Sequence, residues 1–388
     1  MTEPERAAQA VEPAPVSLPG LAHVATCSFL AARLAPSGQF LLGLGGGVAL
    51  ARAGAEHGLR AGYGASGAAV VQTVALIGPA RVAAPLTQAL NAPVAGWMQE
   101  RGASKAARVA AVLGIRLVHY AILNVLFVVV IIGGLDEYVA TYDRIARFFK
   151  VLPEGTAAAI GLTVLTAVFF GLLYSIAQVV IYDRALRRWP AHAPEPEAVE
   201  EEPATEPAGR PRVPWLALIA TVAVWVLLLA STAWAVLGGV AAGLALATVL
   251  TPARRAGRQV WGVGVGLALV LAISALIPAL LGAVDWDAAG PRAVRAALLV
   301  LSATWLRAVA GASGIREAFR RGLLAVRAVP AAAEAATITD QLASDRRLMP
   351  AARAFVAAFS DVPLRPRPVA DALTGWVAAE TRGYRPPP

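Results

Sequence analysis

The sequence predicts an all-α, polytopic integral membrane protein: two helical membrane halves, an acidic proline-rich linker between them, and C-terminal cytoplasmic amphipathic helices. Of its 388 residues, 57% are hydrophobic and only 15% are charged, whereas a soluble chain carries about a quarter charged residues. Several apolar runs reach the roughly twenty residues that a helix needs to cross a bilayer. These runs are continuous, whereas the strands of a membrane β-barrel alternate with period two.

The first half begins with a segment that has no apolar run. Residues 1–20 are acidic and rich in proline and lack the basic start of a signal peptide, so we expect a disordered cytoplasmic leader. Residues 21–188 are predicted to form an N-terminal membrane domain of four or five spans. The candidate spans are 38–51, 65–86, 109–134 and 156–182, with a weaker apolar stretch at 21–34.

Loop charges orient this half. The connections at 101–108 and 183–188 are basic and are predicted to be cytoplasmic, because positive loops stay inside. The segment 135–155 is then outside. Its apolar residues recur at spacings of three and four, which predicts an amphipathic helix along the membrane interface.

The second half follows a predicted linker at 189–213, which is rich in proline and glutamate and shows no apolar periodicity. Residues 214–312 are predicted to form a four-helix membrane domain. Its basic loop at 252–258 is expected inside, and the loop at 283–290, which carries only Asp285 and Asp287, outside. The predicted spans are 214–233, 234–250, 259–283 and 293–312.

Composition argues against several chemistries. Cys27 is the single cysteine, and the four histidines show no ligand spacing, so we expect no metal site and no cofactor. The sequence shows no P-loop, no dinucleotide-binding motif and no nucleophile–base set, which predicts a protein that is not an enzyme. The net charge of +9 lies mainly in the loops and the tail. It favours anionic lipids over nucleic acid as partners.

Polar residues within the predicted spans of the first half are candidates for a ligand pocket, because such groups are costly in a membrane. The alternative is that they hold helices together. Arg81 and Arg116 are interpreted as side chains that reach the head groups. The candidate pocket residues are Gln72, Gln88, Asn91, His119, Asn124 and Gln178.

The tail, residues 313–388, is predicted to be a cytoplasmic domain of coupling helices. A basic amphipathic helix begins at Gly314 and is suited to the membrane surface, and Pro330 interrupts it. A second helix is expected to reach about Leu348. A third is expected from about Pro368 to Thr381, closed by Gly383.

The tail ends in ALTGWVAAETRGYRP and follows four spans that open with a tight hairpin. This pattern, over 214–388, resembles the transmembrane T component of energy-coupling factor (ECF) transporters, an ABC-type uptake system for vitamins or metal ions. Thr381 stands where the family usually has alanine. The resemblance implies contact with cytosolic ATPase subunits and a substrate-binding membrane subunit, which the first half could supply. The implied coupling residues are Arg382, Gly383 and Tyr384, with Arg346 or Arg347 in an earlier, degenerate motif.

Other interpretations remain open. The basic tail could recruit cytosolic proteins or anionic lipid to a membrane scaffold without transport. A lipid-modifying membrane enzyme is a further alternative, which the absence of an acid–base or nucleophile cluster disfavours. Residues 92–105 faintly echo 373–386, with Arg101 in the place of Arg382, but chance explains so short a match better than an internal repeat. In each case we expect a multi-pass protein of the cell membrane with a cytoplasmic C-terminus.

Overall fold

The computed structural model describes residues 16–35, 39–78, 83–150, 152–189, 215–255, 258–326, 328–359, 362–363 and 365–384. These residues form helices and no strand, as the sequence predicts. Residues 1–15 of the predicted leader and 190–213 of the predicted linker lie outside the described part of the chain, as do Pro79, Arg81 and Arg385.

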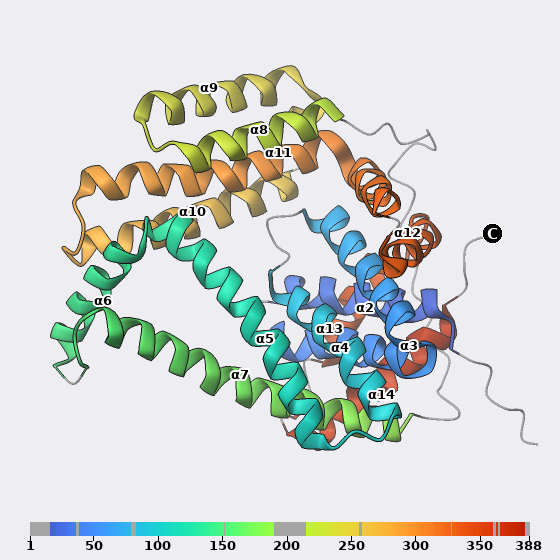
Figure 1. Ribbon diagram of the computed structural model, residues 1–388. Helices are drawn as coiled ribbons and strands as arrows, with labels where there is room; N and C mark the ends of the chain where they lie inside the picture. The colour runs from blue at the N-terminus through green and yellow to red at the C-terminus, as the bar shows by residue number, and fades with distance from the viewer. Residues whose placement is uncertain are drawn as a thin grey trace, which may run out of the picture.

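The helices follow one another along the chain as shown in Figure 1. The first half contains α2 (Leu18–Leu34), α3 (Gln39–Ile77), α4 (Ala83–Glu100), α5 (Lys105–Phe127), the π-helix η2 (Val128–Ile132), α6 (Leu135–Phe149) and α7 (Thr156–Arg187). The second half contains α8 (Trp215–Ala230), α9 (Trp234–Leu250), the 3-10 helix η3 (Pro252–Arg255), α10 (Arg258–Leu280) and α11 (Trp286–Ala325). The tail contains α12 (Pro330–Leu342), α13 (Leu348–Phe359) and α14 (Pro366–Gly383).

Four helices of the described chain are long and apolar enough to cross a membrane. They are Lys105–Ile132, Thr156–Arg187, Val260–Leu280 and Trp286–Ala325, which coincide with four of the predicted spans. The predicted spans 214–233 and 234–250 form the shorter apolar helices α8 and α9. The chain therefore has the helices of a multi-pass membrane protein.

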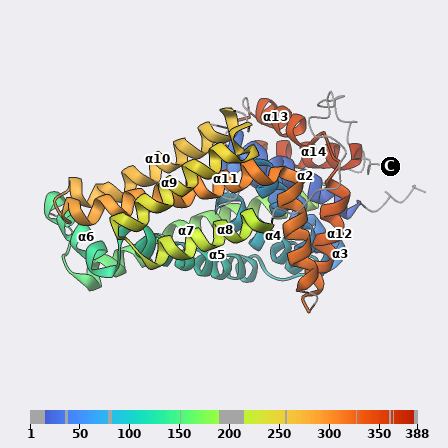
Figure 2. The same ribbon diagram turned by 90° about the horizontal axis from the view of Figure 1, so that it is seen from above.

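Helices α2, α3, α4, α12, α13 and α14 pack together in what we call the terminal body. One apolar core joins them and includes Leu30, Leu44, Leu342 and Leu373, all fully buried. The membrane helices extend away from this body, and α6 lies at their far end (Figures 1 and 2). The predicted spans 38–51 and 65–86 fall largely within α3, so protein covers most of the apolar surface that the sequence assigns to lipid.

Small residues explain how α3 is covered so completely. A methyl group added to Gly47 would lie 1.6 Å from the hydroxyl oxygen of Tyr182, and one added to Gly96 would lie 1.8 Å from the carbonyl oxygen of Ala51. The helix also bends at Gly58 (φ 80°), a conformation that glycine adopts readily. A side chain that packs as closely as Tyr182 on Gly47, and a backbone that approaches as closely as that of Ala51 to Gly96, both need glycine at the contact.

The tail differs from its expected form in three respects. The predicted surface helix after Gly314 is the continuation of α11, which bends at Gly311 (φ 65°). Helix α13 was not predicted. Helix α14 ends at Gly383 as expected, but its cap, Tyr384, is extended (φ −69°). Helices α12 to α14 bury apolar residues against α2 and α3.

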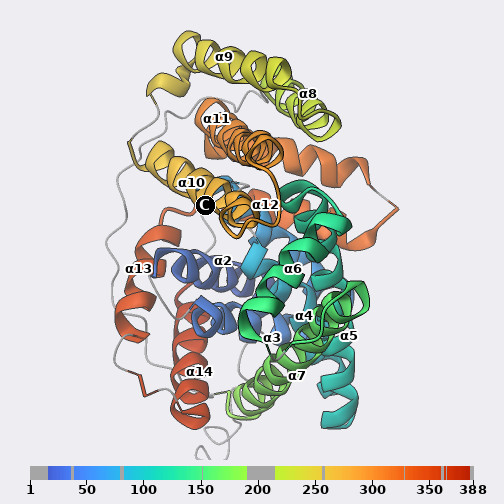
Figure 3. The same cartoon turned by 90° about the vertical axis from the view of Figure 1, so that its left-hand side faces the viewer.

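Viewed end-on, α10 and α11 lie between the α8–α9 hairpin and the segment α5–α7 (Figure 3). Polar contacts join α10 and α11 to the segment α5–α7 at the end far from the terminal body. The Arg144 Nε donates to the carbonyl oxygen of Leu281 at 2.7 Å, and Arg292 pairs with Glu137 and donates to the carbonyl oxygen of Ile132 at 2.7 Å. The predicted amphipathic helix of 135–155 is therefore α6, and it closes this end.

Candidate functional site

A buried cluster of charged and polar side chains lies where α2 meets the tail. His23 of α2 places its Nδ1 against a carboxylate oxygen of Asp345, in the turn between α12 and α13. Its Nε2 lies 3.0 Å from Oε1 of Glu380 on α14. His23 is 1% exposed and Glu380 is 4% exposed. One imidazole thus connects the N-terminal helix to two separate tail elements.

Two carboxylates around one imidazole favour its protonated form. Burial lowers the pKa of His23, while the hydrogen bonds to Asp345, Cys27 and Glu380 raise it, and its pKa lies well above the ordinary value. Burial raises the pKa of Asp345, but the contacts with His23 and with the Arg347 backbone outweigh this and lower it. The cluster is best described as an imidazolium held between carboxylates.

The coupling residues implied by the resemblance divide between this cluster and the surface. Arg347 donates to the carbonyl oxygen of Gly383 at 3.0 Å and to Glu380 at 3.4 Å. The Tyr384 ring packs against His23 with centroids 5.2 Å apart, and its side chain is buried. Arg346 and Arg382 are exposed. Because Arg347 bonds Gly383, the two predicted motifs come together at one corner of the terminal body.

A cysteine–histidine pair, which the sequence did not lead us to expect, is present in the cluster. The Cys27 sulfur lies 3.5 Å from Nε2 of His23, one helical turn away on α2. Burial raises the pKa of the Cys27 thiol, so the sulfur stays protonated. Cys27 is fully buried, and in this conformation the pair is not exposed to a substrate.

Part of the predicted ligand pocket comes together at the interface of α4, α5 and α7. The Tyr182 hydroxyl donates to Oε1 of Gln88 at 2.9 Å, and Nε2 of Gln178 donates to the same hydroxyl at 3.0 Å. Nearby, His119 Nδ1 lies 2.9 Å from the Thr87 hydroxyl. These side chains link three helices through hydrogen bonds.

Arg116 belongs to this interface, so the interpretation that its side chain reaches the head groups is wrong. Its guanidinium donates to Oε1 of Gln178 at 2.6 Å and to the Tyr120 hydroxyl at 3.2 Å, and the residue is 3% exposed. Acceptors on α5 and α7 satisfy two of its nitrogens within the protein, so it remains buried at mid-helix.

The other three candidate pocket residues are placed differently. Gln72 donates to the carbonyl oxygen of Thr339 at 3.0 Å and so joins α3 to α12. Asn124 is exposed and bonds the carbonyl oxygen of Tyr120 in its own helix. Asn91 is fully buried, and its two amide atoms have no hydrogen-bond partner among the described residues.

Sequence reasoning missed His23 and Asp345 as functional candidates. One local signal was available: His23 and Cys27 stand one turn apart in an apolar stretch, where polar residues are costly. The two carboxylate partners of His23 lie more than 300 residues away from it in the chain. Residues so far apart form no local sequence pattern from which their contact could be predicted.

Comparisons of the chain with family models, with curated proteins and with solved structures find no match.

Proposed function

We propose that this protein is the membrane-embedded coupling component of an ATP-driven, ECF-type uptake system for a vitamin or metal ion, without catalytic activity of its own. In this proposal the terminal body faces the cytoplasm and binds ATPase subunits. The membrane helices respond when those subunits move. The observation that carries the proposal is the continuity of α11, which passes from an apolar segment directly into contact with the terminal body.

The contacts of α11 support the transmission of movement. Arg307 donates to the carbonyl oxygen of Leu76 on α3 at 3.3 Å, and Arg316 donates to that of Ala343 beside α12 at 2.6 Å. At the other side, Arg108 of α5 donates to Oε1 of Gln99 on α4, part of the terminal body, at 2.6 Å and to Asp183 of α7 at 2.9 Å. A displacement of the terminal body would therefore reach both groups of membrane helices.

The corner that carries Arg346 and Arg382 is the proposed ATPase contact. Both side chains are exposed, and the backbone beside them is fixed by the bond from Arg347 to Gly383. Guanidinium groups pair with carboxylates in a bidentate geometry, which suits a contact that must carry force. The buried His23 cluster holds this corner to α2.

The test is purification from native membranes under gentle conditions. The variant Arg346→Glu/Arg382→Glu reverses the charge of the corner, and Arg367→Glu reverses an exposed charge at the other end of α14. We expect ATPase subunits with the wild type and with Arg367→Glu, and at least tenfold less with the double variant, by quantitative mass spectrometry.

Two results would count against the proposal. If no ATPase subunits are purified with the wild type under conditions that preserve membrane complexes, the proposed uptake system lacks its source of energy. If the double variant instead loses other cytosolic proteins, the protein is a recruiting scaffold that uses the same corner.

A further inference from the structure

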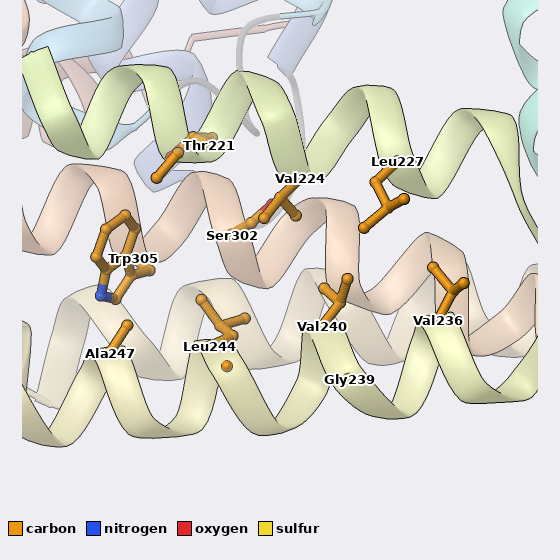
Figure 4. A pocket seen from close by; sticks show the side chains of 12 residues that line it. Thr221, Val224, Leu227, Val236, Gly239, Val240, Leu244, Ala247, Ser302 and Trp305 are labelled. Carbon is orange, nitrogen blue, oxygen red and sulfur yellow. The ribbon is translucent and has the colours of Figure 1, made fainter.

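Helices α8, α9 and α11 line an apolar cavity, open on one side as a groove, that the proposed function does not use. Its volume is about 410 Å³, within the roughly 300–1,000 Å³ range of small-molecule sites. Figure 4 shows side chains of α8, α9 and α11 lining it, among them Val224, Val240 and Leu244. Three lining residues, Thr221, Ser302 and Trp305, carry polar side-chain atoms.

Two of these three polar groups are satisfied by protein. The Thr221 hydroxyl donates to the carbonyl oxygen of Ala217 at 2.8 Å. The Ser302 hydroxyl donates to the carbonyl oxygen of Leu299 at 2.9 Å and accepts from the Trp225 indole at 2.9 Å. Such a cavity offers few free hydrogen-bonding groups to a polar molecule, and its apolar lining suits a hydrocarbon chain.

The third polar group has no partner. Trp305 is 8% exposed, and its indole Nε1 has no hydrogen-bond acceptor among the described residues. Figure 4 shows this nitrogen on the edge of the ring that faces Ala247, which also lines the cavity. A buried indole N–H usually finds a partner. An occupant with one acceptor at this end would satisfy it.

Two glycines open the α9 wall of the cavity. Gly239 and Gly243 are separated by one helical turn, and a methyl group added to either would meet no described atom within 4 Å. Glycines at this spacing commonly let a second membrane helix approach. Here no described atom fills the space over the two glycines.

The Trp305 end of the cavity lies beside a basic segment. Ala253 of η3 packs in one apolar cluster with Trp305 and Ala247, and Trp261 bonds the carbonyl oxygen of Ala253 at 3.0 Å. Arg254, the next residue, is exposed. Ala247 is only three residues from the end of α9. This end is therefore where lipid head groups would lie.

We propose that the cavity binds one acyl chain of an anionic glycerophospholipid. The chain lies along Gly239 and Gly243, the ester carbonyl oxygen accepts from the Trp305 indole, and the phosphate faces Arg254. The occupant is a resident lipid, more strongly held than the lipids that surround the membrane helices. The site is independent of the ATPase contact.

The test uses the full chain in phosphatidylglycerol nanodiscs with a trace of phosphatidylglycerol that carries a photoreactive acyl chain. Labelled peptides are mapped by mass spectrometry. Residues 160–170 of α7, mostly exposed, report ordinary surrounding lipid. We expect labelling of 220–227 and 236–247 at least fivefold above that of α7.

Four variants sharpen the assignment. Gly243→Leu fills the groove and should lower its labelling to the α7 level, whereas Gly238→Leu, equally open but outside the lining, should leave it unchanged. Trp305→Phe removes the indole N–H together with the five-membered ring and should lower labelling by about twofold to tenfold. Arg254→Gln should remove the preference for phosphatidylglycerol over phosphatidylcholine.

Groove labelling no higher than that of α7 in the wild type would overturn the proposal. So would a crosslink that places a membrane helix of a second chain on Gly239 and Gly243. Loss of ATPase subunits from the purified complex would bear on the proposed function and not on this lipid site.

Discussion

Helices α3 and α7 are both long and apolar, yet they occupy different surroundings. Between Leu42 and Gly54 nearly every residue of α3 is buried by protein, and the segment consists largely of glycine, alanine and leucine. Between Ile160 and Phe170 most residues of α7 are exposed, and valine, leucine and phenylalanine dominate. The two segments differ in side-chain size: small residues let protein cover α3, whereas large residues face outward on α7.

The largest effect should come from a substitution at the closest backbone contact. A methyl group in Gly96→Ala would meet the Ala51 carbonyl, a backbone atom that cannot rotate away. We expect a loss of about 4 kcal/mol or more of unfolding free energy, or a failure to fold. The control is Gly161→Ala in α7, where the added methyl meets no described atom within 4 Å. Thermal unfolding in detergent would measure both, and equal effects would contradict the comparison.

A matched pair of phenylalanines tests the same contrast with large side chains. Phe29 in α2 is fully buried by protein, and Phe169 in α7 is 61% exposed. Phe29→Ala should cost about 3–5 kcal/mol because it leaves a cavity. Phe169→Ala should change stability by less than about 1 kcal/mol in detergent or lipid. A large loss from Phe169→Ala would show that protein, not lipid, covers this face.

Removing the imidazole of the buried cluster should cost slightly less. In His23→Ala, two buried carboxylates lose their shared cation, although Arg347 still reaches Glu380. Breaking one partner of a buried charge pair costs about 3–5 kcal/mol, and we expect about 3 kcal/mol here. The measurement is protease cleavage within 360–384, with His57→Ala on α3, a partly exposed histidine, as the control. Unchanged cleavage in His23→Ala would mean that apolar packing alone holds α14.

Much of the helical architecture can be predicted from local sequence. The apolar runs of α5, α7, α10 and α11 are long enough to specify membrane helices, and the spacing within 135–149 specifies the amphipathic α6. The terminal body could not be predicted this way. Its core contains residues of both α2 and α14, which lie near opposite ends of the chain. The spacing of apolar residues within one helix does not indicate which other helix it packs against.

The candidate site shows the same limit. The tail motif drew attention to Arg382, Gly383 and Tyr384, and the structure places Tyr384 and the nearby Glu380 around a common group. That group is His23, and the sequence around it shows no pattern that indicates a carboxylate partner. The resemblance implied that Tyr384 lies beside a coupling arginine, Arg382, and the structure adds that the Tyr384 ring packs against His23.

The pH dependence of this cluster should be the smallest and most diagnostic effect. Because the folded pKa of His23 is raised, its contribution is complete below the unfolded pKa, about 6.5, and is lost as the pH rises through the folded value. The lowered pKa of Asp345 acts oppositely, so its contribution holds above about pH 4 and is lost as the pH falls. Stability from the cluster is therefore greatest between about pH 4 and 6.5.

Two neighbouring groups, Cys27 and Tyr384, also have shifted pKa values. Burial raises the pKa of each, so both remain neutral to a higher pH than in the unfolded chain. We expect the unfolding temperature of the wild type to fall between pH 7 and 10 by several degrees more than that of His23→Gln. Trp376, stacked on Phe355 at 3.8 Å, offers a fluorescence signal inside the terminal body. Parallel pH profiles for the two proteins would show that the imidazole is neutral in the folded state and that one carboxyl group carries the shared proton.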